Sequence, residues 1–378
     1  AGSPYSIYGV GIVDDNAVTY NTMKGGLGIS NGTSYIINNV NPALLPLNSF
    51  TIFDFGMQYD QRRLTHDSLS TTLKGGGLNY IALAVPIKPG KIGLSLGLSP
   101  YSSVKYNFVA RDEISNDTLS AVYNHISEGG LNQIYLQTGV RVLKPLFIGF
   151  KATYLFGNIN SETKTIPLIP NANAFQTAYF RSNNSKGFLF GLGAVYNKEI
   201  KEKTYLNVGA VYDFSSRLTT TRNEWLSSAA SGVDIETADT LEIIVKDFDG
   251  RIRIPQKMGI GVSINKEFKY TVGIDVYHQN WSEYENLSGN NEGLQRSTKY
   301  IVGGEYTPDF FSVNSYFKRI TLMAGASYTT TPLSIENEDI NDFGINFGAS
   351  LPVSNGSTVN LGFTVGSLGT TKNNLVRE

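Results

Sequence analysis

A two-residue alternation of apolar and polar side chains recurs along most of this chain and constrains its fold more than any other feature. In Ile92–Ser99, isoleucine and leucine alternate with glycine and serine, and the stretch carries no charge. Segments 53–60, 206–213 and 359–366 repeat the pattern. Successive side chains on a β-strand point to opposite faces, so each segment is predicted to be a strand with one apolar face. A membrane-spanning helix needs roughly 18 apolar residues, whereas the longest apolar run here is Tyr80–Val85.

The polar face of these strands distinguishes a soluble β-sandwich from a barrel embedded in lipid. Soluble strands protect their edges with charged side chains, whereas the polar positions here are mainly Gly, Ser and Asn. Charged residues make up only 17% of the chain and gather in connections such as 111–113, 198–203 and 336–339. Small polar residues on one face and Leu, Ile, Val and Phe on the other are typical of an outer-membrane barrel. The 22 tyrosines and 20 phenylalanines suit the aromatic girdles of such a barrel. The sequence therefore predicts an all-β, transmembrane antiparallel β-barrel that crosses the bacterial outer membrane many times.

The strand count and the connection lengths predict how the barrel is oriented. Roughly thirteen strands are expected, starting near Phe50, Leu78, Ile92, Gln133, Ile148, Phe188, Leu206, Ile252, Tyr270, Tyr300, Ile320, Phe343 and Val359. Short connections such as 86–90 alternate with long ones such as 109–130, 160–178 and 215–250. Bacterial barrels have short periplasmic turns and long extracellular loops, and normally an even number of strands. Either Leu241–Val245 is a further strand, or a barrel of about 14 strands lacks its closing strand in this chain; we favour the absent strand.

The N-terminal residues differ from the rest of the chain. Residues 1–48 are rich in Gly, Asn and Ser and lack the alternation, yet they hold too many Tyr, Ile and Val residues for a disordered tail. We expect this segment to fold into the lumen as a hatch that plugs it, with residues 49–378 forming the barrel. Ala1 is expected to be a mature terminus left after cleavage of a signal peptide.

Within the expected hatch, the glycine-rich stretch Met23–Ser30 is followed by Asn41–Leu44 directly before the first strand. This order resembles the long-chain fatty-acid outer-membrane transporter family (FadL/TodX type), whose hatch has a glycine-rich stretch and an Asn-Pro-Ala motif. Ser3–Ser6 and Leu98–Ser103 are similar to the Bacteroidota branch of that family. The resemblance covers essentially the whole chain.

The resemblance implies a fourteen-stranded barrel, plugged by the hatch, through which hydrophobic molecules such as long-chain fatty acids cross by diffusion. It also implies a kinked third strand that opens a lateral gap in the wall. Here Pro100 stands in the middle of the third predicted strand. Proline has no N–H and cannot complete a ladder hydrogen bond, so it belongs at bulges and edges. Both arguments point to Ser99, Pro100 and Tyr101, although Pro100 could simply end the embedded part of the strand.

The candidate site residues belong to the hatch, the lateral opening and the lumen. The hatch candidates are Gly25, Gly26, Gly28, Asn41, Pro42 and Ala43, and the apolar lumen candidates are Leu155, Leu189, Val195, Val211 and Met323. The apolar set predicts either a greasy path for a ligand or packing against the hatch, and both remain open. The charged residues predicted to face the lumen are Asp54, Asp60, Arg141, Lys151, Asp213, Asp275 and Glu305. Such charges normally pair across a lumen or anchor a plug.

Composition argues against several other functions. The chain has no cysteine, its three histidines lie far apart, and its net charge is -1 without a basic block. We therefore expect no metal, no cofactor and no nucleic-acid partner. Gly93–Gly97 matches a hydrolase motif but lies inside an alternating strand, so no enzyme activity is expected. The leading hypothesis is passive transport of hydrophobic small molecules, with outer-membrane lipid as a further contact. The alternative is a structural subunit of a larger outer-membrane secretion or assembly complex, with other membrane or surface proteins as partners.

Overall fold

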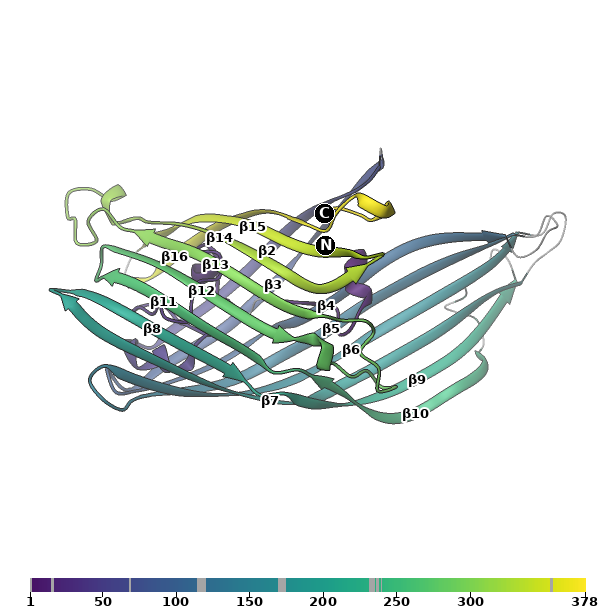
Figure 1. Cartoon of the computed structure of the whole chain (residues 1–378), viewed down its shortest axis with the longest axis horizontal. Coiled ribbons are helices and arrows are strands. Elements are labelled where there is room, and N and C mark those ends of the chain that lie inside the picture. Colours follow the sequence, from purple (N-terminus) through teal and green to yellow (C-terminus); the bar gives the residue numbers. More distant parts are fainter. Residues whose placement is uncertain are drawn as a thin grey trace.

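The structure is a computed structural model that describes residues 2–14, 17–67, 69–113, 120–168, 175–230, 235, 238, 240–353 and 356–378. The described strands form one antiparallel sheet, which curves around a lumen as a barrel wall (Figure 1). The all-β barrel predicted from the alternation is confirmed. No helix in the described ranges has the length and apolar character needed to cross a membrane.

The wall is built from fifteen strands in meander order. They are β2 (Ile52–His66), β3 (Leu69–Lys88), β4 (Ile92–Glu113), β5 (Ser120–Arg141), β6 (Leu146–Leu168), β7 (Phe175–Lys201), β8 (Thr204–Asp213), β9 (Ser216–Ala230), β10 (Thr240–Ile254), β11 (Lys257–Lys266), β12 (Tyr270–Asn280), β13 (Arg296–Tyr306), β14 (Thr321–Ile335), β15 (Glu338–Pro352) and β16 (Thr358–Leu368).

Two wall strands are interrupted, which reduces the fifteen named strands to thirteen spans. β7 pairs with β8 along its lower part and with β9 along its upper part, while β8 pairs with β11 and β9 with β10. Thus β8 and β9 are two parts of one span, and so are β10 and β11. Pro255 stands at the second interruption, where its missing N–H cannot join a ladder. Leu241–Val245 therefore extends a span that was already counted and is no additional strand.

The sheet ends at β2 and β16, which both run from the short-turn end to the long-hairpin end. Only the last residues of the chain lie between these two edges, among the residues that the structure describes. The Arg377 backbone exchanges hydrogen bonds with Thr65 of β2, and the Glu378 backbone exchanges them with Leu368 of β16. A strand that continued from these residues would run antiparallel to both edges.

One side of the barrel extends well beyond the other. β4 to β7 have 22 to 27 residues, whereas β11, β12, β13 and β16 have only 10 or 11. The paired strands β4 to β7, together with β9 and β10, project from the right of Figure 1; we call this part of the sheet the extension. The prediction of long loops at 109–130, 160–178 and 215–250 is wrong, because most of these residues continue the hairpins. Both faces of the extension carry polar groups, so the sequence alternation fades there.

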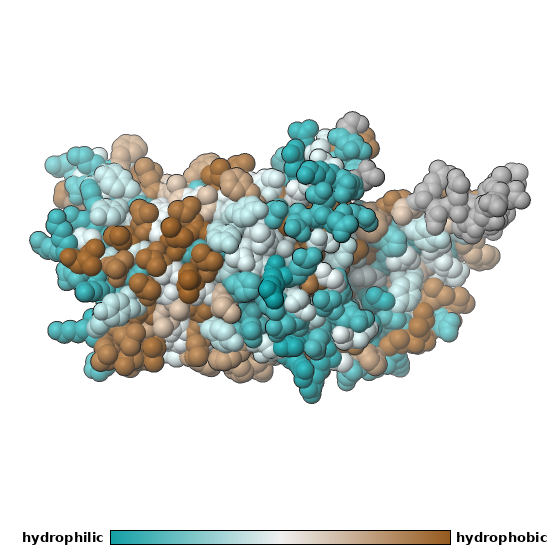
Figure 2. All heavy atoms as spheres, viewed as in Figure 1, coloured by the Kyte–Doolittle hydropathy of each residue, from teal (hydrophilic) through white to brown (hydrophobic). Residues whose placement is uncertain are grey.

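The outward face of the shorter, lower part of the wall is apolar. Side chains such as Ile260, Ile274 and Phe363, which would be buried in a soluble sheet, are 67%, 57% and 63% exposed. Figure 2 shows these hydrophobic surfaces concentrated toward the short-turn end, with a hydrophilic surface beyond them. We call this surface the apolar band, and it is the face that an outer-membrane barrel presents to lipid.

The N-terminal segment, residues 2–14 and 17–48, lies inside the curve of the sheet (Figure 1, purple). It contains η1 (Pro4–Ile7), β1 (Ile12–Val13), α1 (Thr19–Thr22) and η2 (Pro42–Leu47). The Asn41 side chain caps η2 by accepting the Ala43 N–H, and Pro42 occupies the first helical position, where no N–H is needed. The division of the chain into a hatch and a barrel as separate domains stays a prediction.

Candidate functional site

Glycines on the inner face of the wall let the backbone of the N-terminal segment touch the strands directly. A methyl group added at any of these glycines would overlap atoms of the segment. They are Gly93 and Gly139 against η2, Gly149 and Gly193 against Asn41–Ala43, Gly209 against Ile29, Gly303 and Gly325 against Lys24, and Gly348 against Met23. These glycines come from strands all around the barrel. The segment is therefore held on every side in the lower lumen.

Two wall carboxylates bind the segment through buried polar contacts. Asp275 of β12 accepts the backbone N–H groups of Gly28 and Ile29 at 2.8 and 2.9 Å. Glu305 of β13 forms an ion pair of 2.9 Å with Lys24, whose side chain is completely buried. Removing either carboxylate would leave buried donors or a buried cation without a partner, which is costly. Asp275 and Glu305 thus face the lumen as predicted and bind the N-terminal segment, whereas the role of this segment as a plug stays a prediction.

Side-chain nitrogen donors make the second set of contacts between the segment and the wall. Asn41 donates to the carbonyl of Ile29 at 2.7 Å and to that of Ala194 in β7 at 3.3 Å. Gln137 of β5 and Lys151 of β6 both donate to the carbonyl of Asn39, at 2.8 and 3.4 Å. These contacts hold the segment to the adjacent strands β5, β6 and β7, and the carboxylates of Asp275 and Glu305 hold it to β12 and β13.

The predicted hatch residues all lie in this contact layer. Gly25 and Gly26 adopt φ values of +75° and +95°, a left-handed conformation that favours glycine. Gly28 donates to Asp275, and Asn41 both caps η2 and reaches the wall. Pro42 and Ala43 lie against Gly139 and Gly149. A role for these residues in gating stays a prediction.

The predicted lateral opening lies at a break in the sheet. β3 and β4 are paired only as far as Ile81 and Leu98, and the β4–β5 register shifts between Pro100 and Ser102. Above this point the edge of β4 has lost its β3 neighbour. Ser99 and Tyr101 are only 6% and 8% exposed.

The N-terminal segment covers this break. In β1, Ile12 pairs with Ser103, and Val13 pairs with Ser102. The Asp14 N–H donates to the Tyr101 carbonyl at 2.9 Å, and further along the Ser3 N–H donates to the Lys105 carbonyl at 2.8 Å. The edge of β4 is therefore occupied by residues 3–14. Passage through the break would require this segment to move.

The predicted apolar lumen residues pack in clusters with the segment. Leu155 and Leu189 join a core that includes Val10 of the segment. Val195 packs with Ala43 and Leu44, and Met323 packs with Val18 and Met23. Val211 is half-buried, opposite Gly193 and Gly259. A ligand-binding role for the five residues stays a prediction.

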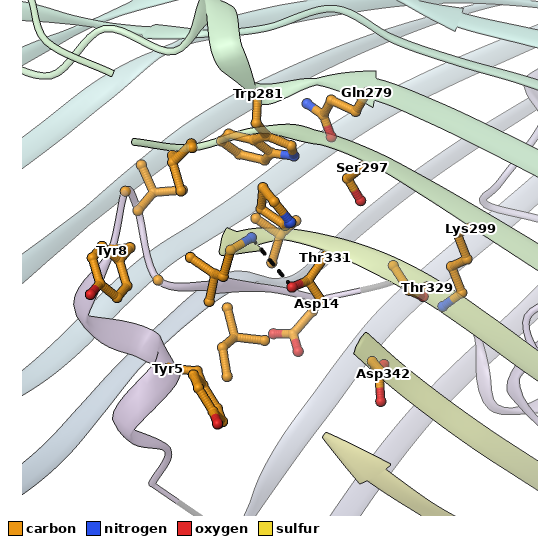
Figure 3. Close-up of a pocket in the computed structure, with 18 of the residues that line it drawn as sticks. Tyr5, Tyr8, Asp14, Gln279, Trp281, Ser297, Lys299, Thr329, Thr331 and Asp342 are labelled. Carbon is orange, nitrogen blue, oxygen red and sulfur yellow. Dashed lines mark hydrogen bonds between the residues drawn. The ribbon is translucent and has the colours of Figure 1, made fainter. Parts of the chain in front are cut away.

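A cavity of about 330 Å³ remains above the packed layer (Figure 3). Its aromatic lining comes from Tyr5 and Tyr8 of the segment and Trp281 of η4 (Trp281–Glu283), with polar groups that include Lys299 and Asp342. Burial raises the pKa of Tyr5, so its hydroxyl stays neutral. The cavity is thus an amphipathic site in which aromatic side chains lie among aliphatic and polar ones.

A second cavity of about 340 Å³ lies at the short-turn end, lined by residues that include Ser30, Tyr35 and Arg141. The packed layer around Ile29 and Asn41 separates the two cavities. Sequence reasoning missed the lining of the upper cavity, because Tyr8 and Trp281 are far apart in the chain and no shared motif links them. No cluster of three potential metal-ligating side chains occurs in the described ranges.

Comparisons with known proteins place the whole chain in a family. A family model described as BamG matches residues 1–378. Among curated protein sequences, none matches this chain.

Solved structures with the same fold include a toluene transporter, a FadL homologue and a monoaromatic hydrocarbon channel. The Pseudomonas putida toluene transporter TodX is 15% identical, with a TM-score of 0.54, over 95% of this chain and 93% of that one. A Pseudomonas aeruginosa FadL homologue is 12% identical, with a TM-score of 0.54, over 93% of this chain and 89% of that one. The CymD monoaromatic hydrocarbon channel is 13% identical, with a TM-score of 0.54, over 96% of this chain and 94% of that one. At these identities the likeness establishes a shared FadL-type fold.

Proposed function

This chain belongs to the BamG family of outer-membrane barrels, and we propose that it serves as a closed accessory barrel within a larger outer-membrane assembly. The observation that carries the proposal is the backbone-to-backbone packing of the N-terminal segment against the inner wall glycines. A channel needs a continuous path, whereas this packing forms a layer between the two cavities, which supports a sealed barrel. A sealed barrel is suited to act as a scaffold.

The extension supplies the surface that such a scaffold needs. Among the described strands, β10 pairs only with β9, so its other edge is open along most of its length. Leu241, Ile243 and Phe248 on this strand are 65%, 60% and 50% exposed. An open edge with exposed apolar side chains, projecting beyond the apolar band, supports binding of a partner protein by edge pairing or by apolar contact.

The test is to purify the tagged protein from its native membrane in mild detergent and to identify bound proteins and lipids by mass spectrometry. Stoichiometric partner proteins are expected. Ile243→Lys should release them, whereas Val109→Lys, at an exposed apolar site on β4, should leave them bound. A barrel purified alone with an acyl-chain ligand would contradict the accessory role.

The second candidate function is passive transport of hydrophobic small molecules, such as long-chain fatty acids. The aromatic upper cavity supports it, since its volume of about 330 Å³ is within the range of small-molecule sites. In this case a ligand would enter from the long-hairpin end and leave past Pro100 after residues 3–14 move away from β4.

Uptake of a labelled fatty acid by cells that carry or lack the gene separates the two functions. Transport predicts slower uptake in the deletion strain and in a Trp281→Ala variant, which lacks the indole ring that lines the cavity. Equal uptake in all strains, with intact partner binding, would leave only the accessory role.

A further inference from the structure

Four basic side chains cluster on the outer face of β7, β9 and β10. Lys186 and Arg251 are both register partners of Thr219, so they lie in one row on either side of it. In the next row toward the short-turn end, Arg217 and Arg253 are direct cross-strand partners. We call these four residues the basic cluster.

The sheet alternation places the basic cluster on the outside of the barrel. Leu218, Ile252 and Ile254, which flank Arg217, Arg251 and Arg253, are buried in the core cluster inside the lumen. On β7, the neighbour of Lys186 is Ser185, which is buried and bonds to Thr220. The flanking positions therefore face the opposite way. Lys186, Arg217 and Arg251 are exposed, and Arg253 is half-buried.

The cluster lies at the upper rim of the apolar band. Phe188 is two residues from Lys186 on the same face of β7 and is 57% exposed. Two residues of a strand span about 7 Å. The Phe188 ring lies against those of Phe190 and Tyr154, with centroids 6.3 and 5.0 Å apart. Lys186 and Arg251 thus sit at the depth of lipid headgroups when the aromatic rings sit among acyl chains, and Arg217 lies one row lower, level with Phe188.

The charge at this level is uneven around the barrel. On β12 to β15, the first outward row beyond the band is uncharged and consists of His278, Thr298, Thr330 and Asn341. The next outward row on that side holds one cation, Arg296, opposite Asn280. The cluster on β7, β9 and β10 is therefore a local feature.

Most of this positive charge has no carboxylate partner. Arg253 pairs with Glu283 and Glu285 at 3.1 and 3.4 Å, so the loop after β12 holds it in place. In the described part of the chain, Lys186, Arg217 and Arg251 form no ion pair. Like charges directly opposite each other on a sheet, as in Arg217 and Arg253, destabilise it. Glu283 and Glu285 offset the charge of Arg253, and an anion bound beside Arg217 would offset the repulsion that remains.

We propose that the basic cluster binds the phosphate-bearing headgroup of an anionic lipid in the outer leaflet. Arginine binds phosphate oxygens in a bidentate manner, and the Thr219 hydroxyl between Lys186 and Arg251 supplies a further donor. The rings of Phe188 and Phe190 then contact the acyl chains of the same lipid. The inference does not depend on whether the lumen is sealed or conducts.

The probe for the test is lipid A in neutral detergent micelles, compared with the same lipid after enzymatic dephosphorylation. The triple variant Lys186→Gln/Arg217→Gln/Arg251→Gln should bind lipid A about 100-fold more weakly at low salt, given about 1 kcal/mol for each basic residue near a charged lipid surface. Arg253 is left in place because it holds Glu283 and Glu285. Lys74→Gln, at an exposed lysine on β3, is the matched control and should bind like the unaltered protein.

The result expected is loss of binding on dephosphorylation, on raising the salt and in the triple variant, at an unchanged melting temperature. Equal binding of both lipids, or of the triple variant and the unaltered protein, would overturn the proposal. If inorganic phosphate displaces lipid A at concentrations as low as those at which lipid A binds, the basic cluster recognises a free anion and is not a lipid site.

Discussion

The lower lumen and the extension are parts of one sheet, but they are filled in different ways. In the lower lumen, wall glycines let the backbone of the N-terminal segment touch the strands, and Asp275 and Glu305 lock it in place. In the extension, cross-strand side-chain pairs such as Arg181 with Glu224 stabilise the sheet, and residues 3–14 of the segment pair with the edge of β4. The comparison teaches that backbone contacts at glycines fix a segment inside a barrel, whereas side-chain pairs join neighbouring strands of its wall.

The largest effect should come from a bulky residue at a wall glycine. Gly325→Val places a side chain where the Lys24 backbone now lies, so the N-terminal segment must move away from the wall. We expect a loss of at least about 4 kcal/mol in unfolding free energy and rapid proteolysis of residues 17–48. Gly77→Val is the control, because a side chain there meets no neighbouring atom. Equal protease resistance of the two variants would show that the glycine contacts do not hold the segment.

A smaller loss should follow when the buried ion pair is broken. Lys24→Met leaves the Glu305 carboxylate buried without its partner, at a cost of about 3 kcal/mol. The double variant Lys24→Met/Glu305→Gln should recover part of this loss. Thermal unfolding of the two single variants and the double variant gives the coupling, and additive losses would contradict a direct interaction.

Removing the second carboxylate should cost less. Asp275→Ala leaves the N–H groups of Gly28 and Ile29 without their acceptor, and we expect a loss of about 2 kcal/mol. Hydrogen exchange of these two amides should accelerate, while amides of the extension such as Thr220 keep their rates. Unchanged exchange at Gly28 and Ile29 would mean that Asp275 does not hold the segment.

The smallest effect is expected in the extension. The Arg181 side chain is 41% exposed, so water screens its pair with Glu224. Glu224→Gln should therefore cost only about 0.5 kcal/mol, and less at high salt. Melting temperatures measured across a salt series provide the check. A loss as large as that of Lys24→Met would erase the contrast between the two regions.

The alternation predicted the membrane spans of the wall, because the face in lipid carries apolar residues and the face in the lumen carries polar ones. The alternation did not predict the strands of the extension, because polar pairs such as His125 with Thr163 take the place of apolar side chains there. It predicted that Asp275 faces the lumen, but the partners of Asp275 are backbone groups, which leave no residue signature. The glycines stood out in composition, yet only their contacts with the segment explain them. The pairing of residues 3–14 with β4 links distant parts of the chain and could not be read from local pattern.

Arg377 and Glu378 lie between β2 and β16, the two edges of the sheet. Their position determines the end from which the gap between these edges would close. Both edges run in the same direction, and the terminal backbone already bonds to Thr65 on one side and Leu368 on the other. These hydrogen bonds already hold the two edges together, so most of the loop-closure entropy is lost before any further strand pairs with them. A strand added there would gain hydrogen bonds to both edges with every residue, so closure would proceed from the long-hairpin end of the barrel toward the short-turn end.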